Sequence, residues 1–504
     1  MSPGLNDRVV VLFLCLAAAI RVFVFAGVFP FFNNVDEQTH FDLVMKYSRG
    51  QIPRGLDPIS AESAHYIVLY GSPEYLFSPD QFSGGKFPPP LWAQPAESVR
   101  NTIQSSEVQW QARPNDEACQ APLYYVLAGM WLNLGRWCGL EGGHLLYWIR
   151  FLNIILIVGL VWVSFVAARM IFPDRRCVRL GVPLLAAFMP QDTYYSIHAD
   201  VLPPLCFGAA FVSAVYFSRA AVPSPRLGAV TGLLLGATYL IKISNIGLLL
   251  VTGAMLLPKV WRLAKTGTLR SATPALTWLV FFTALPIVGW ALWCESIAGD
   301  LICAAPKAVF SGGSTKPFSE WWTHRMFSLH GLGEFWPELT ASFWRGEFVW
   351  FRKPLVSPTV DAFYWISSAL LVGLAAISLF PGFASLTKPQ RQALGFAFWC
   401  FIIMVAFVAW VSISSNFGSL FYPSREHPFL TSGRLLGGAL IPFLVLYVHG
   451  LDWALGRTKR EWLSWIALIG IVLLATISEI VMTRPVISSE YNWFHLPATR
   501  SAKG

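Results

Sequence analysis

The chain has 504 residues, of which 55% are hydrophobic and only 13% are charged, and its mean hydropathy is +0.52. A soluble domain carries about 25% charged residues, and apolar runs of about 18 residues or more recur along this chain, which excludes a soluble fold. The net charge of +9 does not indicate nucleic-acid binding, because the Lys and Arg residues lie in short links between apolar runs. We therefore expect an all-α polytopic membrane protein with no nucleic-acid partner.

The first apolar run, Val9 to Phe32, predicts a retained anchor helix. Arg21 interrupts this run and no small-residue cleavage site follows it, so it does not resemble a signal peptide. Arg21 is expected to face other helices or to extend towards the membrane surface. Further apolar runs predict membrane helices at 147–172, 178–197, 199–219, 226–242, 244–261, 274–298, 361–383, 391–413, 431–451 and 462–483.

The apolar segment 121–139 is short and contains Asn133 and Arg136, so we expect an interfacial or re-entrant helix there. If this segment does not cross, all the basic links can be cytoplasmic at once. These links contain Arg175, Arg176, Arg179, Arg219, Arg226, Lys259, Arg262, Lys265, Arg270, Lys388, Arg391, Arg457, Lys459 and Arg460.

This arrangement predicts one transmembrane domain over 1–504 with about eleven crossings, the N-terminus in the cytoplasm and the C-terminus outside. Two long polar loops, 33–146 and 299–360, would then lie on the outer face. One carries Cys119 and the other Cys303, and the sequence leaves open whether these pair.

The first candidate site follows the first apolar run, where Asp36 and Glu37 are adjacent and His40 comes shortly after. In a helix Asp36 and His40 share a face. A carboxylate there could accept a proton from a hydroxyl group or hold a divalent cation. The alternative is a solvated helix start, where the helix dipole favours acids.

Two further stretches combine acids with aromatic residues. In 115–125, Gln120 and Tyr124 flank Pro122, a pattern that is also typical of a simple helix start beside an aromatic belt. In 190–200, His198 and Asp200 lie in a link between two apolar runs. An acid there is a functional candidate because burying it in the membrane is costly, and the alternative is a helix N-cap.

Arg150, Lys242 and Arg434 lie at the predicted outer ends of helices, where the positive-inside pattern does not place cations. Cations in this position indicate an anionic ligand such as a phosphate. Contact with lipid headgroups is the alternative for each of them.

The chain resembles the GT-C superfamily of membrane glycosyltransferases, and within it a largely uncharacterised bacterial family of polytopic membrane proteins. The matching segments are 35–40 (VDEQTH), 120–125 (QAPLYY), 236–242 (GATYLIK) and 432–436 (SGRLL), with 342–348 (SFWRGEF) as a further match. Four positions depart from the superfamily pattern. These are Ala121 in place of a proline, Ala199 in place of an asparagine, Ile241 in place of a threonine and Leu435 in place of an aromatic residue.

The resemblance implies a GT-C-like helical bundle that transfers a sugar from a polyprenyl-phosphate carrier to an acceptor hydroxyl, with inversion, on the outer face of a bacterial inner membrane. The acceptor would be a saccharide, a lipid or a protein, and membrane lipids would surround the bundle. Asp36 would be the general base, with Glu37 and Asp200 as further catalytic acids. The implied substrate-binding residues are His40, Gln120, Tyr124, Arg150, His198, Lys242 and Arg434. Members of the superfamily differ in their use of a metal, so no cofactor is certain, and Mg or Mn between Asp36 and Asp200 stays open.

Two other functions use the same residues. A transporter or flippase of lipid-linked sugars would need a polar path through the helices, and Asp192 and Glu479 are among the few acids within the apolar runs. A non-catalytic assembly protein of the same fold is the third hypothesis, which the departures at Ala121, Ala199 and Leu435 leave open.

Overall fold

The computed structural model describes residues 6–310, 312–418, 423–424, 426–457 and 460–497. Lys459, one of the residues expected in a cytoplasmic link, lies outside these ranges. The described part is all-α apart from short two-residue strands, which confirms the predicted fold class. β1 (Ser314–Thr315) pairs antiparallel with β4 (Ser415–Asn416), and β2 (Val349–Trp350) pairs antiparallel with β3 (Lys353–Pro354).

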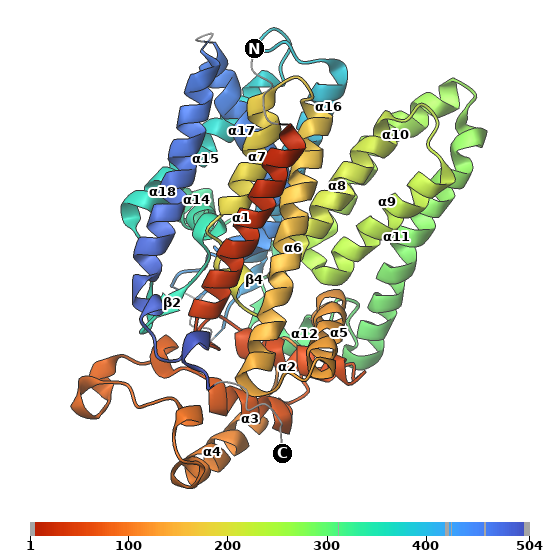
Figure 1. The fold of residues 1–504 in the computed structure, drawn as a ribbon. Coiled ribbons are helices and arrows are strands. Elements are labelled where there is room, and N and C mark those ends of the chain that lie inside the picture. Colours follow the sequence, from red (N-terminus) through yellow and green to blue (C-terminus); the bar gives the residue numbers. More distant parts are fainter. Residues whose placement is uncertain (1–5, 311, 419–422, 425, 458–459, 498–504) are drawn as a thin grey trace.

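Nine helices of the described ranges, some extended by a short 3-10 turn, are long and apolar enough to cross a membrane. They are α1 (Asp7–Val28), α6 (Gly142–Ile171), α8 (Pro203–Arg219), α10 (Ile246–Lys265), α11 (Leu269–Ala298), α15 (Pro358–Ser378), α16 (Lys388–Ser414), α17 (Leu440–Gly456) and α18 (Glu461–Ile487). Two predicted crossings contain shorter helices, α7 (Arg176–Phe188) and α9 (Pro225–Ile241). In Figure 1, α7 runs within the bundle beside α1 and α6, while α9 lies against α11.

The prediction of one continuous helix over 178–197 is wrong, because α7 ends at Phe188. Pro190 explains this end, since a proline disfavours helical backbone at the preceding residue and cannot donate a backbone hydrogen bond. Met189 accordingly has extended geometry, with φ −62° and ψ 119°. The chain continues through two 3-10 turns, η5 (Asp192–Tyr195) and η6 (Ala199–Val201). This segment, 189–202, contains no α-helix, and it carries the candidate site residues His198 and Asp200.

The first predicted loop forms a layer across one end of the bundle (Figure 1). It contains α2 (Glu37–Ser48), α3 (Ala61–Tyr70), α4 (Ala96–Gln111) and α5 (Leu123–Trp137), with the 3-10 turns η1 (Pro73–Tyr75), η2 (Pro79–Gln81), η3 (Ser83–Gly85) and η4 (Leu91–Ala93). α5 is not among the helices of the described ranges that are long enough to cross. The N-terminal end of α1 lies at the opposite end of the bundle.

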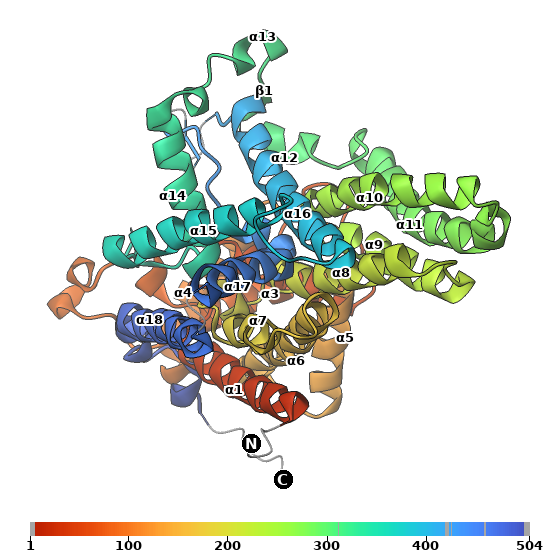
Figure 2. The same ribbon diagram turned by 90° about the horizontal axis from the view of Figure 1, so that it is seen from above.

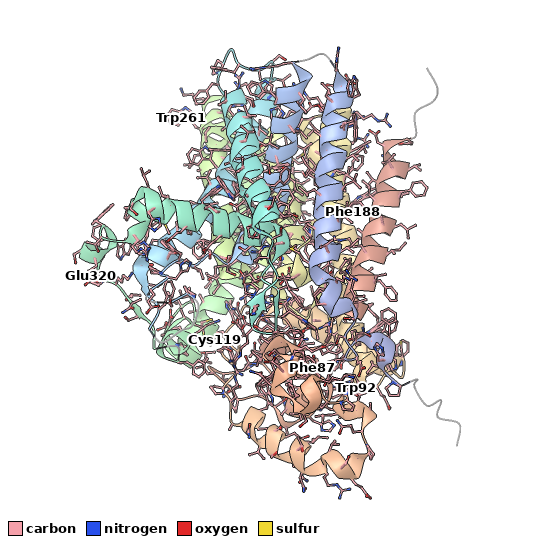
Figure 3. The ribbon with its side chains drawn as sticks, turned by 90° about the vertical axis from the view of Figure 1, so that its left-hand side faces the viewer. Phe87, Trp92, Cys119, Phe188, Trp261 and Glu320 are labelled. Carbon is pink, nitrogen blue, oxygen red and sulfur yellow. A yellow bond between two sulfur atoms is a disulfide. The ribbon has the colours of Figure 1, made fainter. Side chains whose placement is uncertain are left out.

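The second loop contains α12 (Ala305–Phe310), α13 (Phe318–Trp321), η8 (Arg325–Phe327) and α14 (Leu329–Arg345). Figure 2 shows α13 and α14 extending to one side of the bundle and α9, α10 and α11 to another. A disulfide between Cys119 and Cys303 joins the two loops, with 5.7 Å between the Cα atoms. Figure 3 places Cys119 towards the loop-covered end and Trp261 near the other end.

A buried ion pair holds the first part of the non-helical segment against α1 and α18. The Arg21 guanidinium contacts the Glu479 carboxylate at 2.7 Å, and both side chains are buried. Arg21 also donates to the carbonyl oxygens of Ala187, at 3.1 Å, and Met189, at 2.7 Å. These carbonyls belong to the end of α7, so Arg21 satisfies acceptors that the interrupted helix leaves free.

Candidate functional site

Four segments that are far apart in the sequence meet beneath the loop layer. The Arg434 Nη2 atom lies 3.0 Å from Asp36 Oδ2, and its Nη1 atom lies 2.6 Å from His198 Nε2. The Arg434 Nε atom lies 3.7 Å from Asp200 Oδ2, and Lys242 forms an ion pair with the other oxygen of Asp200. Asp36, Asp200, Lys242 and Arg434 thus form one cluster of alternating charge, which we call the charged cluster.

The charged cluster is open on one side. The side chains of Asp36, Arg434 and Lys242 keep 30%, 18% and 16% of their exposure, whereas Asp200 keeps 1%. Ion pairs whose members stay in reach of solvent can exchange partners with a bound ligand, whereas a buried and saturated pair cannot do so without a large cost. The buried Asp200 therefore anchors Lys242, and the other three side chains stay partly exposed.

Local backbone geometry directs Asp36 towards Arg434. Asp36 stands at the N-cap of α2 with a left-handed φ of 63°, and its side chain makes no capping hydrogen bond. Asp200 likewise bonds Lys242 rather than capping a helix, and α8 begins after Leu202. Asp36 therefore does lie at a partly exposed helix start, but its side chain pairs with Arg434 instead of capping the helix, and Asp200 is not the N-cap of α8.

Arg434 is placed by the glycine before it. A Cβ atom on Gly433 would lie 1.9 Å from the backbone nitrogen of Phe343, so only glycine allows this approach to the end of α14. The Ser342 hydroxyl fixes the contact, since it donates to the Thr431 carbonyl at 2.6 Å and accepts from the Gly433 N–H at 2.8 Å. The first turn after this contact, η9 (Gly433–Ala439), then carries Arg434 into the cluster.

Two histidines line the buried side of the charged cluster. A guanidinium only donates hydrogen bonds, so His198 Nε2 accepts from Arg434 and the ring is neutral. Burial, and then the neighbouring His40 and Arg434, lower the pKa of His198. The His40 ring lies 4.1 Å from the His198 ring, and its Nδ1 atom is 2.7 Å from the Tyr125 hydroxyl. Burial is also the main cause that lowers the pKa of His40.

Glu37 and Arg150 do not join the open side of the cluster. They form a bidentate pair, with Arg150 Nε and Nη2 at 2.9 Å and 2.8 Å from the two Glu37 oxygens, and their side chains are 0% and 1% exposed. Glu37 also accepts from the backbone N–H groups of Phe32 and Ile197, both at 2.9 Å. The structure therefore argues against a catalytic Glu37 and a phosphate-binding Arg150. The pair instead holds the backbone at Phe32 and Ile197, in the segments that lead to Asp36 and His198.

Gln120 and Tyr124 are not members of the charged cluster. Gln120 donates to Glu117, which also forms an ion pair with Lys307 of α12. The Lys307 and His40 charges lower the pKa of Glu117 to about 2 against the opposing effect of burial. Tyr124 is 1% exposed. The Cys119–Cys303 disulfide holds this neighbourhood together, because Cys119 lies between Glu117 and Gln120 while Cys303 precedes Lys307.

Sequence reasoning did not name Glu347 as a site residue, although it lies in the quoted segment 342–348. Its Oε2 atom is 3.8 Å from Arg434 Nε, and its backbone N–H donates to Asp192 Oδ2 at 3.1 Å. Asp192 is buried, and burial followed by the charge of Glu347 raises the pKa of Asp192 to about 7. Glu347 could have been recognised in the sequence as an acid directly after Gly346 in the matching segment 342–348.

The described residues do not fit the metal that the sequence left open. Arg434 contacts both Asp36 and Asp200, the two carboxylates named as ligands, and its guanidinium takes the position between them. Within the described ranges, no group of three or more His, Cys, Asp or Glu side chains could hold a metal ion.

The apolar bundle, the loop layer and the charged cluster beneath it define a polytopic membrane protein with a polar site at one end. The family model described as "Predicted membrane protein (DUF2142)" matches residues 20–420, and the chain belongs to this family. The matched region contains Asp36, Asp200, Lys242 and Glu347 and ends before Arg434. No curated protein matches the chain.

Proposed function

We propose that this protein is a membrane glycosyltransferase of the GT-C type, which transfers a sugar from a polyprenyl-phosphate carrier to an acceptor hydroxyl. One observation carries the proposal. Of the five segments on which the resemblance rests, 35–40, 236–242 and 432–436 supply Asp36, Lys242 and Arg434 to the charged cluster, and 342–348 places Glu347 beside Arg434. The fifth segment, 120–125, supplies no member of the cluster. Residues that resemble one active site in sequence are thus neighbours in space.

The charges of the cluster suit a lipid-linked sugar phosphate. Arg434 and Lys242 keep part of their exposure, and Arg434 can turn from Asp36 to the phosphate oxygens. Arginine offers paired N–H donors to phosphate and lysine offers a compact charge. The remaining partner of Lys242 is the buried Asp200, so the lysine stays anchored while it contacts the ligand.

In the proposed reaction the acceptor oxygen forms a bond to the anomeric carbon while the carbon–oxygen bond to the carrier phosphate breaks. The phosphate leaves with the bonding electrons, and Arg434 and Lys242 stabilise its charge. Asp36 takes the proton of the acceptor hydroxyl, and attack opposite the leaving phosphate inverts the anomeric centre. General-base assistance of this kind contributes about 10²–10⁴-fold to the rate.

The disulfide supports the placement of this end of the bundle on the outer face of a bacterial inner membrane. Disulfides persist in oxidising compartments such as the periplasm and are rare in the cytosol. Cys119 and Cys303 join the two loops at the end of the bundle that contains the cluster. The basic links, such as the one with Arg175 and Arg176 between α6 and α7, lie at the other end. This orientation puts the N-terminus in the cytoplasm and the C-terminal tail outside.

The transporter alternative receives less support. It drew on Glu479 as a polar residue inside a helix, but Glu479 is paired with Arg21 and bonded by Tyr195. A saturated buried pair offers no vacant ligand position along a path. The non-catalytic hypothesis predicts that the protein binds the lipid-linked sugar without releasing undecaprenyl phosphate, which distinguishes it from the proposed enzyme.

The test uses purified protein in nanodiscs with a panel of undecaprenyl-phosphate sugars, and follows the release of undecaprenyl phosphate. We expect wild type to release it and Asp36→Asn to be slower by about 10²-fold or more. Asp80→Asn is the matched control, because Asp80 is an exposed acid of the same loop layer outside the cluster.

Undiminished release by Asp36→Asn would refute the assigned base. Binding of the lipid-linked sugars without release by wild type, with any acceptor, would favour the non-catalytic hypothesis. Movement of the intact lipid between leaflets without bond cleavage would favour the transporter.

A further inference from the structure

The backbone around Glu347 is fixed from both sides. Arg345 forms a bidentate pair with Asp361 of α15, at 2.8 Å and 3.1 Å. Gly346 has a φ of +80°, and a Cβ atom there would lie 1.8 Å from Asp192 Oδ1. The Glu347 N–H is itself bonded to Asp192. These contacts fix the backbone position from which the Glu347 side chain extends.

The carboxylate of Glu347 is by contrast left unsaturated. Its Oε1 atom is buried and has no hydrogen-bond partner among the described residues. Its Oε2 atom lies 3.8 Å from Arg434 Nε, beyond hydrogen-bond distance. Leaving a buried acceptor without a hydrogen bond costs about 1–3 kcal/mol, and more for a charged group. A fixed backbone that presents an unsatisfied acceptor indicates a ligand that brings a donor.

The position of Glu347 determines which donor this is. Arg434 lies between Glu347 and Asp36, so the two partly exposed carboxylates flank the cation assigned to the phosphate. The groups nearest to the phosphate of a lipid-linked sugar are the hydroxyls of its ring. Carboxylates are the usual acceptors for such hydroxyls because each oxygen can take a hydrogen bond.

We propose that Glu347 binds a ring hydroxyl of the donor sugar and so contributes to sugar recognition in the charged cluster. This inference rests on the proposed function and deepens it, because it assigns the sugar to the α14 side of Arg434 and the acceptor to the Asp36 side.

The experiment compares the affinity of detergent-purified protein for undecaprenyl phosphate with its affinity for undecaprenyl phosphate bearing a hexose, a pentose or an N-acetylhexosamine. Wild type should bind at least one sugar-bearing lipid about 10-fold more tightly than the sugar-free lipid, as expected for a hydrogen bond to a charged group. Glu347→Gln should lose most of this gain and keep its affinity for the sugar-free lipid. Arg434→Gln should weaken the binding of both lipids.

Glu334→Gln is the matched control, because Glu334 lies on α14, which ends shortly before Glu347, and its exposure is 28% against 22% for Glu347. In the described part of the chain it pairs with Arg325 and His330. Its preference for the sugar should equal that of wild type. A full preference retained by Glu347→Gln overturns the inference and leaves the proposed function standing. Equal affinity of wild type for sugar-free and sugar-bearing lipids also overturns it, and failure to bind any of these lipids overturns the proposed function as well.

Discussion

Replacing Arg150 by methionine tests whether the Glu37–Arg150 pair is structural or binds a ligand. The substitution removes two bonds to Glu37 and three donors to the carbonyl oxygens of Ala26, Phe29 and Pro30 at the end of α1. It leaves the Glu37 carboxylate charged at 0% exposure. Breaking a buried pair from one side costs about 3–5 kcal/mol, and the carbonyls that lose a donor place Arg150→Met at the upper end of this range.

The assay is thermal unfolding in nanodiscs, followed by tryptophan fluorescence at one scan rate because large membrane proteins unfold irreversibly. Arg325→Met is the control, since Arg325 is 49% exposed in its pair with Glu334 and such pairs contribute about 0–1 kcal/mol. Glu37→Leu combined with Arg150→Met should recover part of the loss, because it removes the unpaired charge. If Arg150→Met unfolds as late as the control but no longer binds undecaprenyl phosphate, the structural role is refuted and Arg150 is a ligand residue.

Three further predictions concern other parts of the site. The folded-state pKa of Asp192, about 7, is above its ordinary 3.8, so folding binds this proton and stability falls as the pH rises between these values. Asp192→Asn should therefore gain stability relative to wild type at about pH 8 compared with about pH 5, measured as the difference in unfolding temperature. Gly346→Ala should cost about 1–3 kcal/mol, since its φ of +80° and ψ of −162° suit only glycine, and should displace Glu347, measured as lost sugar preference. Reducing the Cys119–Cys303 bond should cost about 2–4 kcal/mol, measured by unfolding with and without reductant.

The membrane helices were predictable because each long apolar run has only one way to bury its backbone polar groups in lipid. Their ends were less predictable where a helix stops for a local reason. Pro190 was visible in the sequence, but the predicted crossing was extended past it to Ile197, over the polar residues 191–193, and so missed the helix end that a missing N–H group marks. The consequence is large, since the segment after Phe188 delivers His198 and Asp200 to the site.

The cations of the site were found from their departure from the positive-inside pattern. That criterion selected Lys242 and Arg434, which meet in the charged cluster, and equally Arg150, which does not. It could not separate them, because the partner of Arg150 is Glu37, 113 residues away in sequence. Likewise, adjacency made Glu37 a candidate beside Asp36, although consecutive residues at a helix start point in different directions.

Burial and saturation make the distinction that residue type does not. Asp36 with Arg434 and Glu37 with Arg150 have the same chemistry and lie at the same end of the bundle. The second pair is closed, since the described neighbours supply hydrogen bonds to both charged groups and neither is exposed. The first is open, with 30% and 18% exposure, and it leaves Glu347 beside it with an unsatisfied oxygen. A closed pair contributes only while it is intact, whereas an open pair can exchange one carboxylate for a phosphate at little cost, and for this reason the proposed reaction is assigned to Arg434 and its neighbours.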